Sequence, residues 1–96
     1  MTTTVVAEIR PLAGQEREVE QALRAAVTRV LAEDRGCERY ELNTDPTDGS
    51  YVMIERWADE AALAEHAAGP AFADLGTALE GRLAQPIVVR ALHPLT

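Results

Sequence analysis

Three side chains that could carry out chemistry lie close together in the sequence, between Glu55 and His66. Histidine is the side chain that most often exchanges protons at physiological pH, so the imidazole of His66 could take a proton from a phenol or quinol hydroxyl. The indole of Trp57 could form one wall of an aromatic cavity and donate its N–H to a substrate oxygen. Glu55 lies on the same strand face as Trp57, and a carboxylate that faces an apolar cavity must be paired, hydrogen-bonded or protonated. We therefore predict Glu55, Trp57 and His66 as catalytic residues.

Each of these three residues also has a purely structural interpretation. His66 could be a histidine that is hydrogen-bonded at the end of a helix, next to Gly69 and Pro70. Trp57 could anchor a helix to the sheet from within the core, with or without a second role in a cavity wall. Glu55 could form a salt bridge with an Arg, in the same chain or across a dimer. The sequence leaves both interpretations open for each residue.

A second set of residues could line a substrate pocket around the first three. The two tyrosines are candidate hydrogen-bond donors, although tyrosine in a sheet more often serves packing. Met53 lies on the strand face that carries the predicted glutamate and tryptophan, and Leu63 lies on the helix face that carries the histidine. The predicted substrate-binding residues are Tyr40, Tyr51, Met53, Leu63 and Phe72.

Hydrophobic periodicity and helix-end signals predict the elements that position these side chains. In chain order we expect a strand at 3–10, a helix between Gly14 and Gly36, strands at 37–44 and 50–57, a helix at 59–68, a helix from Pro70 and a strand at 87–92. The expected apolar stripes are Val19, Leu23, Ala26, Val27, Val30 and Leu31 on the first helix, and Phe72, Leu75, Leu79 and Leu83 on the third. Asp59 stands where a helix N-cap belongs.

This order of elements predicts an α+β fold of the ferredoxin-like, split βαβ type, with an antiparallel sheet and helices on one face. Residues 1–96 are expected to form a single domain. Apolar residues also occur on the strand faces that the helices leave open. Because a contiguous apolar face is typical of an interface, we expect a homodimer that closes through the sheets.

Composition excludes several classes of function. The net charge is −7 and no basic stripe is visible, so a nucleic-acid partner is not expected. All nine cationic residues are Arg, so the chain has no Lys for Schiff-base chemistry, and Ser50, the only serine, lies in a turn. The neighbours of His66 at helical spacing are not metal ligands, so we expect no metal on this helix. Cys37 is alone, which favours a reducing cytoplasm, and no segment resembles a signal peptide or a membrane span.

Several segments together resemble the antibiotic-biosynthesis monooxygenase (ABM) domain family. They are Gly36-Cys37-Glu38-Arg39-Tyr40-Glu41-Leu42, Val52-Met53-Ile54-Glu55-Arg56-Trp57, Ala62-Leu63-Ala64-Glu65-His66 and Gly69-Pro70-Ala71-Phe72. The resemblance implies a dimeric α+β barrel with one cavity per subunit between sheet and helices. It also implies oxidation of a quinol, polyphenol or anthrone-like small molecule by O₂ without metal or flavin.

The residues can also be compared with those of two branches of that family. The haem-degrading branch has an Asn on the first strand and a Trp on the second helix. At the corresponding positions this chain has Ala7 and His66. The later His of that branch corresponds to a position near Gly76. Anthrone-oxidising members have a Trp matched by Trp57, but their Asn four residues earlier is replaced by Met53.

The leading hypothesis is therefore a cofactor-independent monooxygenase that acts on a small aromatic substrate with O₂. A second hypothesis is an isomerase or a similar enzyme that processes a small signalling metabolite with the same His and Glu but without oxygen. A third is a dimeric binding or stress-related protein without catalysis. A cavity that is filled by Met53, Trp57 and Phe72 would favour the third hypothesis.

Overall fold

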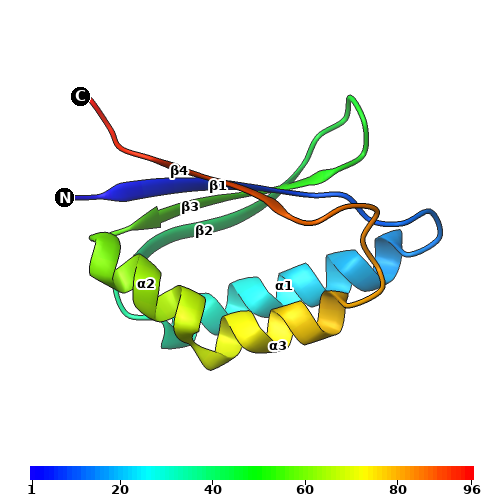
Figure 1. Ribbon diagram of the computed structural model, residues 1–96, viewed down its shortest axis with the longest axis horizontal. Coiled ribbons are helices and arrows are strands. Elements are labelled where there is room, and N and C mark those ends of the chain that lie inside the picture. Colours follow the sequence, from blue (N-terminus) through cyan, green and yellow to red (C-terminus); the bar gives the residue numbers. More distant parts are fainter.

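Four strands form one antiparallel sheet, and three helices cover one face of it, in the computed structural model, which describes residues 1–96 (Figure 1). The elements are β1 (Thr3–Ile9), α1 (Glu16–Glu33), β2 (Cys37–Thr44), β3 (Tyr51–Trp57), α2 (Glu60–Ala68), α3 (Pro70–Leu79) and β4 (Val88–Leu92). All strands and helices lie close to their predicted positions.

The strand order is β2-β3-β1-β4, and every neighbouring pair is antiparallel. The edge strand β2 therefore lies beside β3, and the edge strand β4 lies beside β1, as in the split βαβ arrangement. This topology confirms the ferredoxin-like prediction. In the register between β1 and β3, Val5 lies opposite Glu55 and Ala7 lies opposite Met53, so these side chains share the face that the helices cover.

Strand alternation and helix periodicity build the core from the same face. In β1 and β3 every second residue is buried, from Thr3 to Ile9 and from Tyr51 to Trp57. The helix α1 packs on these strands through four buried side chains, which are Val19, Leu23, Ala26 and Val30. The predicted stripes are therefore largely confirmed, because hydrophobic burial selects the helix face that meets the sheet.

Three residues of the predicted stripes depart from the prediction, and one of them, Phe72, is 42% exposed. Leu31 is 55% exposed because it lies at the open side of α1, beside the edge strand β2. The prediction that α3 runs on to Leu83 is wrong, since the helix ends at Leu79. Gly81 adopts φ +75°, which turns the chain away from the helix, and Leu83 then bridges to Pro11 as a short strand-like contact.

The turn after α1 packs tightly against the start of α2. Gly36 has φ +77°, and a Cβ atom placed there would lie 2.6 Å from the Cβ of Ala62. The carbonyl of Gly36 also accepts a hydrogen bond from the backbone N–H of Ala58, at 2.8 Å. Only glycine fits this close approach, which brings the C-terminal end of α1 next to α2.

The opposite face of the sheet is not covered by any helix (Figure 1). Val6, Val52 and Ile54 are half-buried there by their strand neighbours, while Val88 and Leu92 on β4 are more than 40% exposed. Charged residues on the same face include Glu8, Arg39, Glu41, Arg56 and Arg90.

No helix of this structure is both long enough and apolar enough to cross a membrane.

A first prediction concerns the N-cap of α2. The Asp59 carboxylate accepts a hydrogen bond from the backbone N–H of Ala62 at 2.8 Å. Asp59→Ala should lower the free energy of unfolding by about 1 kcal/mol in urea denaturation, while Asp59→Asn, which keeps a capping acceptor, should change it by only a few tenths. Equal losses in the two variants would contradict the capping role.

A second prediction concerns the uncovered face, which we propose as the interface of a homodimer. An obligate interface should bury on the order of 2,000 Å² in total and make the melting temperature depend on protein concentration. Sedimentation at micromolar concentration should then show a dimer, and Ile54→Asp, on the open face of a central strand, should shift it towards monomer. A monomer whose melting temperature does not change on dilution would rule this interface out.

Candidate functional site

A cavity of about 270 Å³ lies between the sheet and the helices α1, α2 and α3. Glu55 and His66 are its only lining residues that are not hydrophobic. Of the residues predicted from the sequence, the cavity brings together Tyr40, Met53, Glu55, Leu63, His66 and Phe72. Val89, which is 60% exposed, and Ile87 complete the wall near β4, and Phe72 is 42% exposed. The cavity is therefore largely apolar, and its two lining residues that are not hydrophobic lie on different elements.

The imidazole of His66 lies among three aromatic rings. Its ring centre is 4.5 Å from that of Trp57, 5.3 Å from that of Phe72 and 5.6 Å from that of Tyr40. Such edge and tilted contacts between rings are favourable beyond simple burial. His66 is the only buried residue of α2, so the inward face of this helix is organised around the histidine.

One ring nitrogen of His66 has a specific partner. Its Nδ1 lies 2.5 Å from Oδ2 of Asp34, the residue that caps the C-terminal end of α1. The side chains of the pair are 4% and 14% exposed. The other nitrogen, Nε2, has no hydrogen-bond partner in the chain. The partner of the histidine thus comes from the end of a different helix, α1.

Glu55 and Trp57 form a second buried pair. The indole N–H of Trp57 donates a hydrogen bond to Oε1 of Glu55 at 3.0 Å, and Trp57 itself is fully buried. Desolvation raises the pKa of the Glu55 carboxyl, although the bond from Trp57 and the nearby imidazole of His66 oppose this shift. Glu55 makes no ion pair with any Arg of the chain. Trp57 therefore acts on the cavity through the carboxyl that it holds.

Tyr40 lies opposite Glu55 in the pairing of β2 with β3 and lines the same cavity. Burial, and secondly the charge of Glu55, raise the pKa of the Tyr40 hydroxyl far above its usual range. The hydroxyl therefore stays protonated at any physiological pH. It is a hydrogen-bond donor within an otherwise apolar wall.

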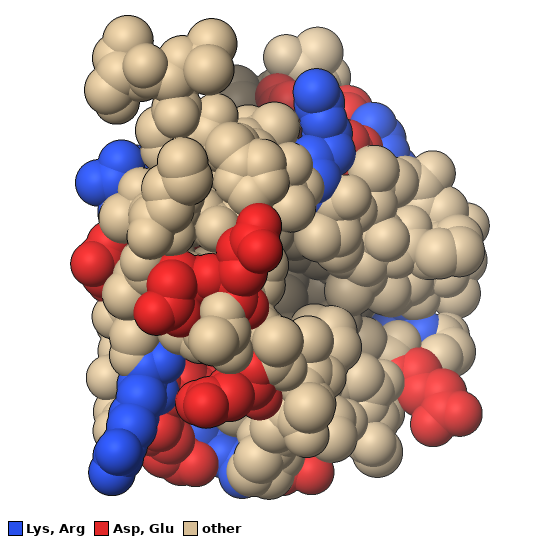
Figure 2. Space-filling model, turned by 60° about the vertical axis from the view of Figure 1, so that its left-hand side comes forward, with Lys and Arg blue, Asp and Glu red and all other residues tan.

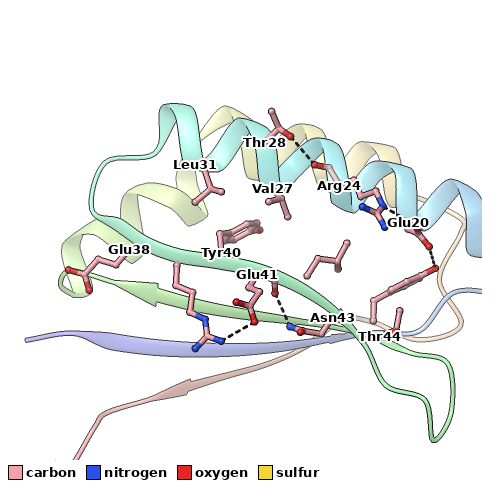
Figure 3. A pocket seen from close by; sticks show the side chains of 13 residues that line it. Glu20, Arg24, Val27, Thr28, Leu31, Glu38, Tyr40, Glu41, Asn43 and Thr44 are labelled. Atoms are coloured by element: carbon pink, nitrogen blue, oxygen red, sulfur yellow. Dashed lines mark hydrogen bonds and ion pairs between the residues drawn. The ribbon is translucent and has the colours of Figure 1, made fainter.

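Tyr51 is not part of this cavity. Tyr51 begins β3, at the opposite end of the strand from Trp57. Its hydroxyl donates a hydrogen bond to Oε1 of Glu20 at 3.1 Å and lies 3.3 Å from the carbonyl oxygen of Glu16, both on α1. It lines a separate groove of about 740 Å³ between α1 and β2, where charged side chains such as Arg24 and Glu41 alternate with apolar ones (Figure 3). The structure therefore separates Tyr51 from the other predicted site residues except Tyr40, which lines both the groove and the cavity.

Sequence reasoning missed Asp34, which is the hydrogen-bond partner of His66. The only local signal is an acidic residue just before the Gly36 that ends the predicted helix. The pairing depends on the close packing of that glycine against α2. The hydrophobic periodicity of the sequence gives no indication of this contact. Ile87 and Val89 were missed for a similar reason, because the register of β4 decides which of its residues face the helices.

The electrostatics of the cavity follow from its lining. No Arg reaches it, and the chain has no Lys, so no permanent cation faces a ligand there. Figure 2 shows the end of the molecule at which the termini lie, where a hollow is bordered largely by uncharged atoms and carboxylates gather to one side. A histidine with a free nitrogen, a phenol and a carboxyl with a raised pKa can together exchange protons with a bound hydroxyl group.

Comparisons with known proteins agree with this architecture. The model of the family described as Antibiotic biosynthesis monooxygenase matches residues 2–77. The Mycobacterium tuberculosis protein named "Putative monooxygenase Rv0793" is 31% identical over 91 residues, which cover 95% of this chain and 89% of that protein.

Solved structures are similar over nearly the whole chain. The structure of Rv0793 gives a TM-score of 0.92 at 26% identity and covers 100% of this chain and 97% of that chain. A structure from Caulobacter crescentus gives a TM-score of 0.92 at 26% identity and covers 99% of this chain and 91% of that chain. The structure of PA3566 from Pseudomonas aeruginosa gives a TM-score of 0.88 at 30% identity and covers 99% of this chain and 95% of that chain. With its fold, its cavity and this match over most of its length, the chain belongs to the antibiotic biosynthesis monooxygenase family.

Proposed function

We propose that this protein is a monooxygenase that oxidises a neutral, hydroxylated aromatic molecule, such as a quinol, a polyphenol or an anthrone, with O₂ and without metal or flavin. The observation that carries the proposal is His66, whose Nε2 has no hydrogen-bond partner in the chain, on the wall of an apolar cavity whose only other ionisable groups are a carboxyl and a phenol. Membership of the family supports monooxygenase-like chemistry, and the cavity supports the substrate class.

The size of the cavity favours a substrate of one to a few rings. A cavity of roughly 150 Å³ is enough to hold benzene, and sites for drug-sized ligands start at roughly 300 Å³. The present cavity, at about 270 Å³, lies between these limits. Met53 and Phe72 border this space without filling it, so the volume argues against a cavity that is closed by its own side chains.

The proposed chemistry begins with transfer of the hydroxyl proton of the substrate to His66. The resulting anion shares its charge with a ring carbon, and this carbon gives electrons to O₂ and forms a C–O bond. The peroxide anion then takes the proton back from the imidazolium. In an anthrone-like substrate, loss of water from the hydroperoxide leaves a ketone, so that CH₂ and O₂ become C=O and H₂O. All electrons come from the substrate carbon, so no external reductant is needed.

The protein's share in this reaction is mainly electrostatic. The Tyr40 hydroxyl can donate a hydrogen bond to the developing oxyanion, because its pKa is raised by burial and it remains protonated. Apolar walls exclude water and so strengthen this interaction and protect the intermediate. Trp57 keeps Glu55 in place by its indole N–H, and the second carboxyl oxygen has no hydrogen-bond partner in the chain.

A second candidate function is proton transfer without oxygen, as in an isomerase. It is favoured by the presence of two different proton carriers, Glu55 and His66, on the same cavity. Burial raises the pKa of Glu55, so one group could donate a proton while the other accepts one. Turnover that continues under anaerobic conditions would select this function over oxidation.

A third prediction tests the base. With a quinol or anthrone that the native protein turns over, His66→Gln should lower the rate of oxygen uptake by about 10²- to 10⁴-fold, the usual contribution of a general base. His93→Gln is the matched control, because that exposed imidazole lies near the chain end and touches only Glu60. Oxygen uptake no faster than in buffer, for every member of an aerobic substrate panel, would refute the proposed oxidation.

A fourth prediction tests the substrate class by binding alone. Trp57, the only Trp, stacks near His66, so its fluorescence should change when a ligand enters the cavity. Under anaerobic conditions a neutral naphthalenediol should bind at least about 10-fold more tightly than the same ring with a carboxylate, because an unpaired charge is costly to desolvate.

Two matched substitutions sharpen this measurement. Val89→Arg places a cation at the wall of the cavity and should reduce the difference between the two ligands. Leu31→Arg, an equal change at the separate groove beside β2, should leave the difference as it is. Equal affinity of the native protein for both ligands would contradict the proposed preference.

A further inference from the structure

We propose that Asp34 is a positioning residue: it holds the imidazole of His66 so that Nδ1 carries the proton and Nε2 presents a free electron pair to the cavity. This inference rests on the proposed function for its consequence in catalysis. The arrangement of the two side chains can be tested independently of any reaction.

The geometry of the pair is the first support. Oδ2 of Asp34 lies 2.5 Å from Nδ1 of His66, and both side chains are largely withdrawn from solvent. In a neutral imidazole one nitrogen donates and the other accepts. A carboxylate at Nδ1 can only accept, so it selects the form in which Nδ1 carries the proton and Nε2 is the basic atom.

The surroundings of the ring are the second, independent support. His66 lines two hollows, which are the apolar cavity and an outer hollow of about 230 Å³ that is lined by Glu33, Asp34, Arg35, Glu65, His66, Gly69 and Pro70. Apart from Pro70, the side chains that line the outer hollow are polar or charged. Asp34 belongs to the outer hollow only. Because the two nitrogens point to nearly opposite sides of the ring, the Nδ1 bond towards Asp34 directs Nε2 towards the cavity.

The backbone holds both partners in place. The N–H of Asp34 donates to the carbonyl of Val30 at 2.9 Å and its carbonyl accepts from Cys37, which anchors the residue between α1 and β2. On the other side, the approach of Gly36 to Ala62 fixes α2 against this turn. A hydrogen bond between two such anchored side chains loses little conformational freedom when it forms.

The charged groups around the ring favour the same role. Glu33, Asp34 and Glu65 face the outer side together with Arg35, and Glu55 and Tyr40 face the inner side. When Nε2 accepts the proton of a substrate, the adjacent Asp34 carboxylate stabilises the imidazolium without taking a proton itself. The outer hollow also gives the pair contact with solvent while a substrate occupies the cavity.

The first arm of the test is spectroscopic and needs no substrate. In protein labelled with ¹⁵N-histidine, at a pH where the ring is neutral, the ring nitrogens of His66 should show a protonated Nδ1 and an unprotonated Nε2. His93, which is exposed, serves as the reference in the same spectrum. Asp34→Asn should raise the population with the proton on Nε2, because an amide can donate as well as accept. Glu65→Gln removes a carboxylate from the same hollow and should leave the spectrum unchanged.

The second arm uses turnover. With a substrate that the native protein oxidises, Asp34→Asn should lower kcat by at least about 10-fold with little change in KM, which is the typical loss when an orienting carboxylate is removed. In the His66→Gln background the same substitution should cost little more, because the two residues act as a unit. Glu65→Gln should keep the native kcat.

The outcomes separate the two proposals. A native spectrum with the proton on Nε2, or a population that Asp34→Asn leaves unchanged, would overturn the role of Asp34 whatever the enzyme does. The expected spectrum without oxygen uptake by any substrate would instead refute the proposed oxidation and leave the pair intact. If Asp34→Asn fails to fold, the spectrum of the native protein alone still decides between the two forms of the ring.

Discussion

Burial of two ionisable side chains in an apolar interior is the constraint on which this structure depends. Glu55 and His66 both face a cavity that is otherwise hydrophobic, and a buried polar group without a partner costs about 1–3 kcal/mol. Each therefore has one: the indole of Trp57 for Glu55 and the carboxylate of Asp34 for His66. These two bonds link β3 to itself and α1 to α2, so the polar requirements of the site and the packing of the fold are met by the same residues.

The arrangement also explains why the site lies where it does. The split βαβ topology places β1 and β3 at the centre of the sheet, where inward side chains are covered by helices and shielded from water. The helix α2 is short, and His66 is its only buried residue. Its position is therefore set by capping, by the turn at Gly36 and by the histidine, more than by a broad apolar stripe. The cavity that lies beneath it is lined mainly by hydrophobic side chains.

Much of this could be predicted from the sequence, because the decisive signals are local. Alternation put Met53, Glu55 and Trp57 on one strand face, and a capping residue followed by helical spacing brought Leu63 and His66 back over that face. Tyr51 shares the alternation, but its position at the far end of β3 places it in another groove. The partner of His66 and the contribution of β4 could not be predicted, since both depend on contacts between elements that are distant in the chain.

The close approach of Gly36 to Ala62 has a consequence for how such a protein can change over evolutionary time. Any side chain at position 36, or a larger one at position 62, would push α2 away from the end of α1. That shift would lengthen the distance between Asp34 and His66 without altering a single residue that lines the cavity. Natural variation at these two small residues should therefore be correlated, and drift at position 62 offers a route by which the reactivity of descendants could diverge while their ligand pocket stays the same.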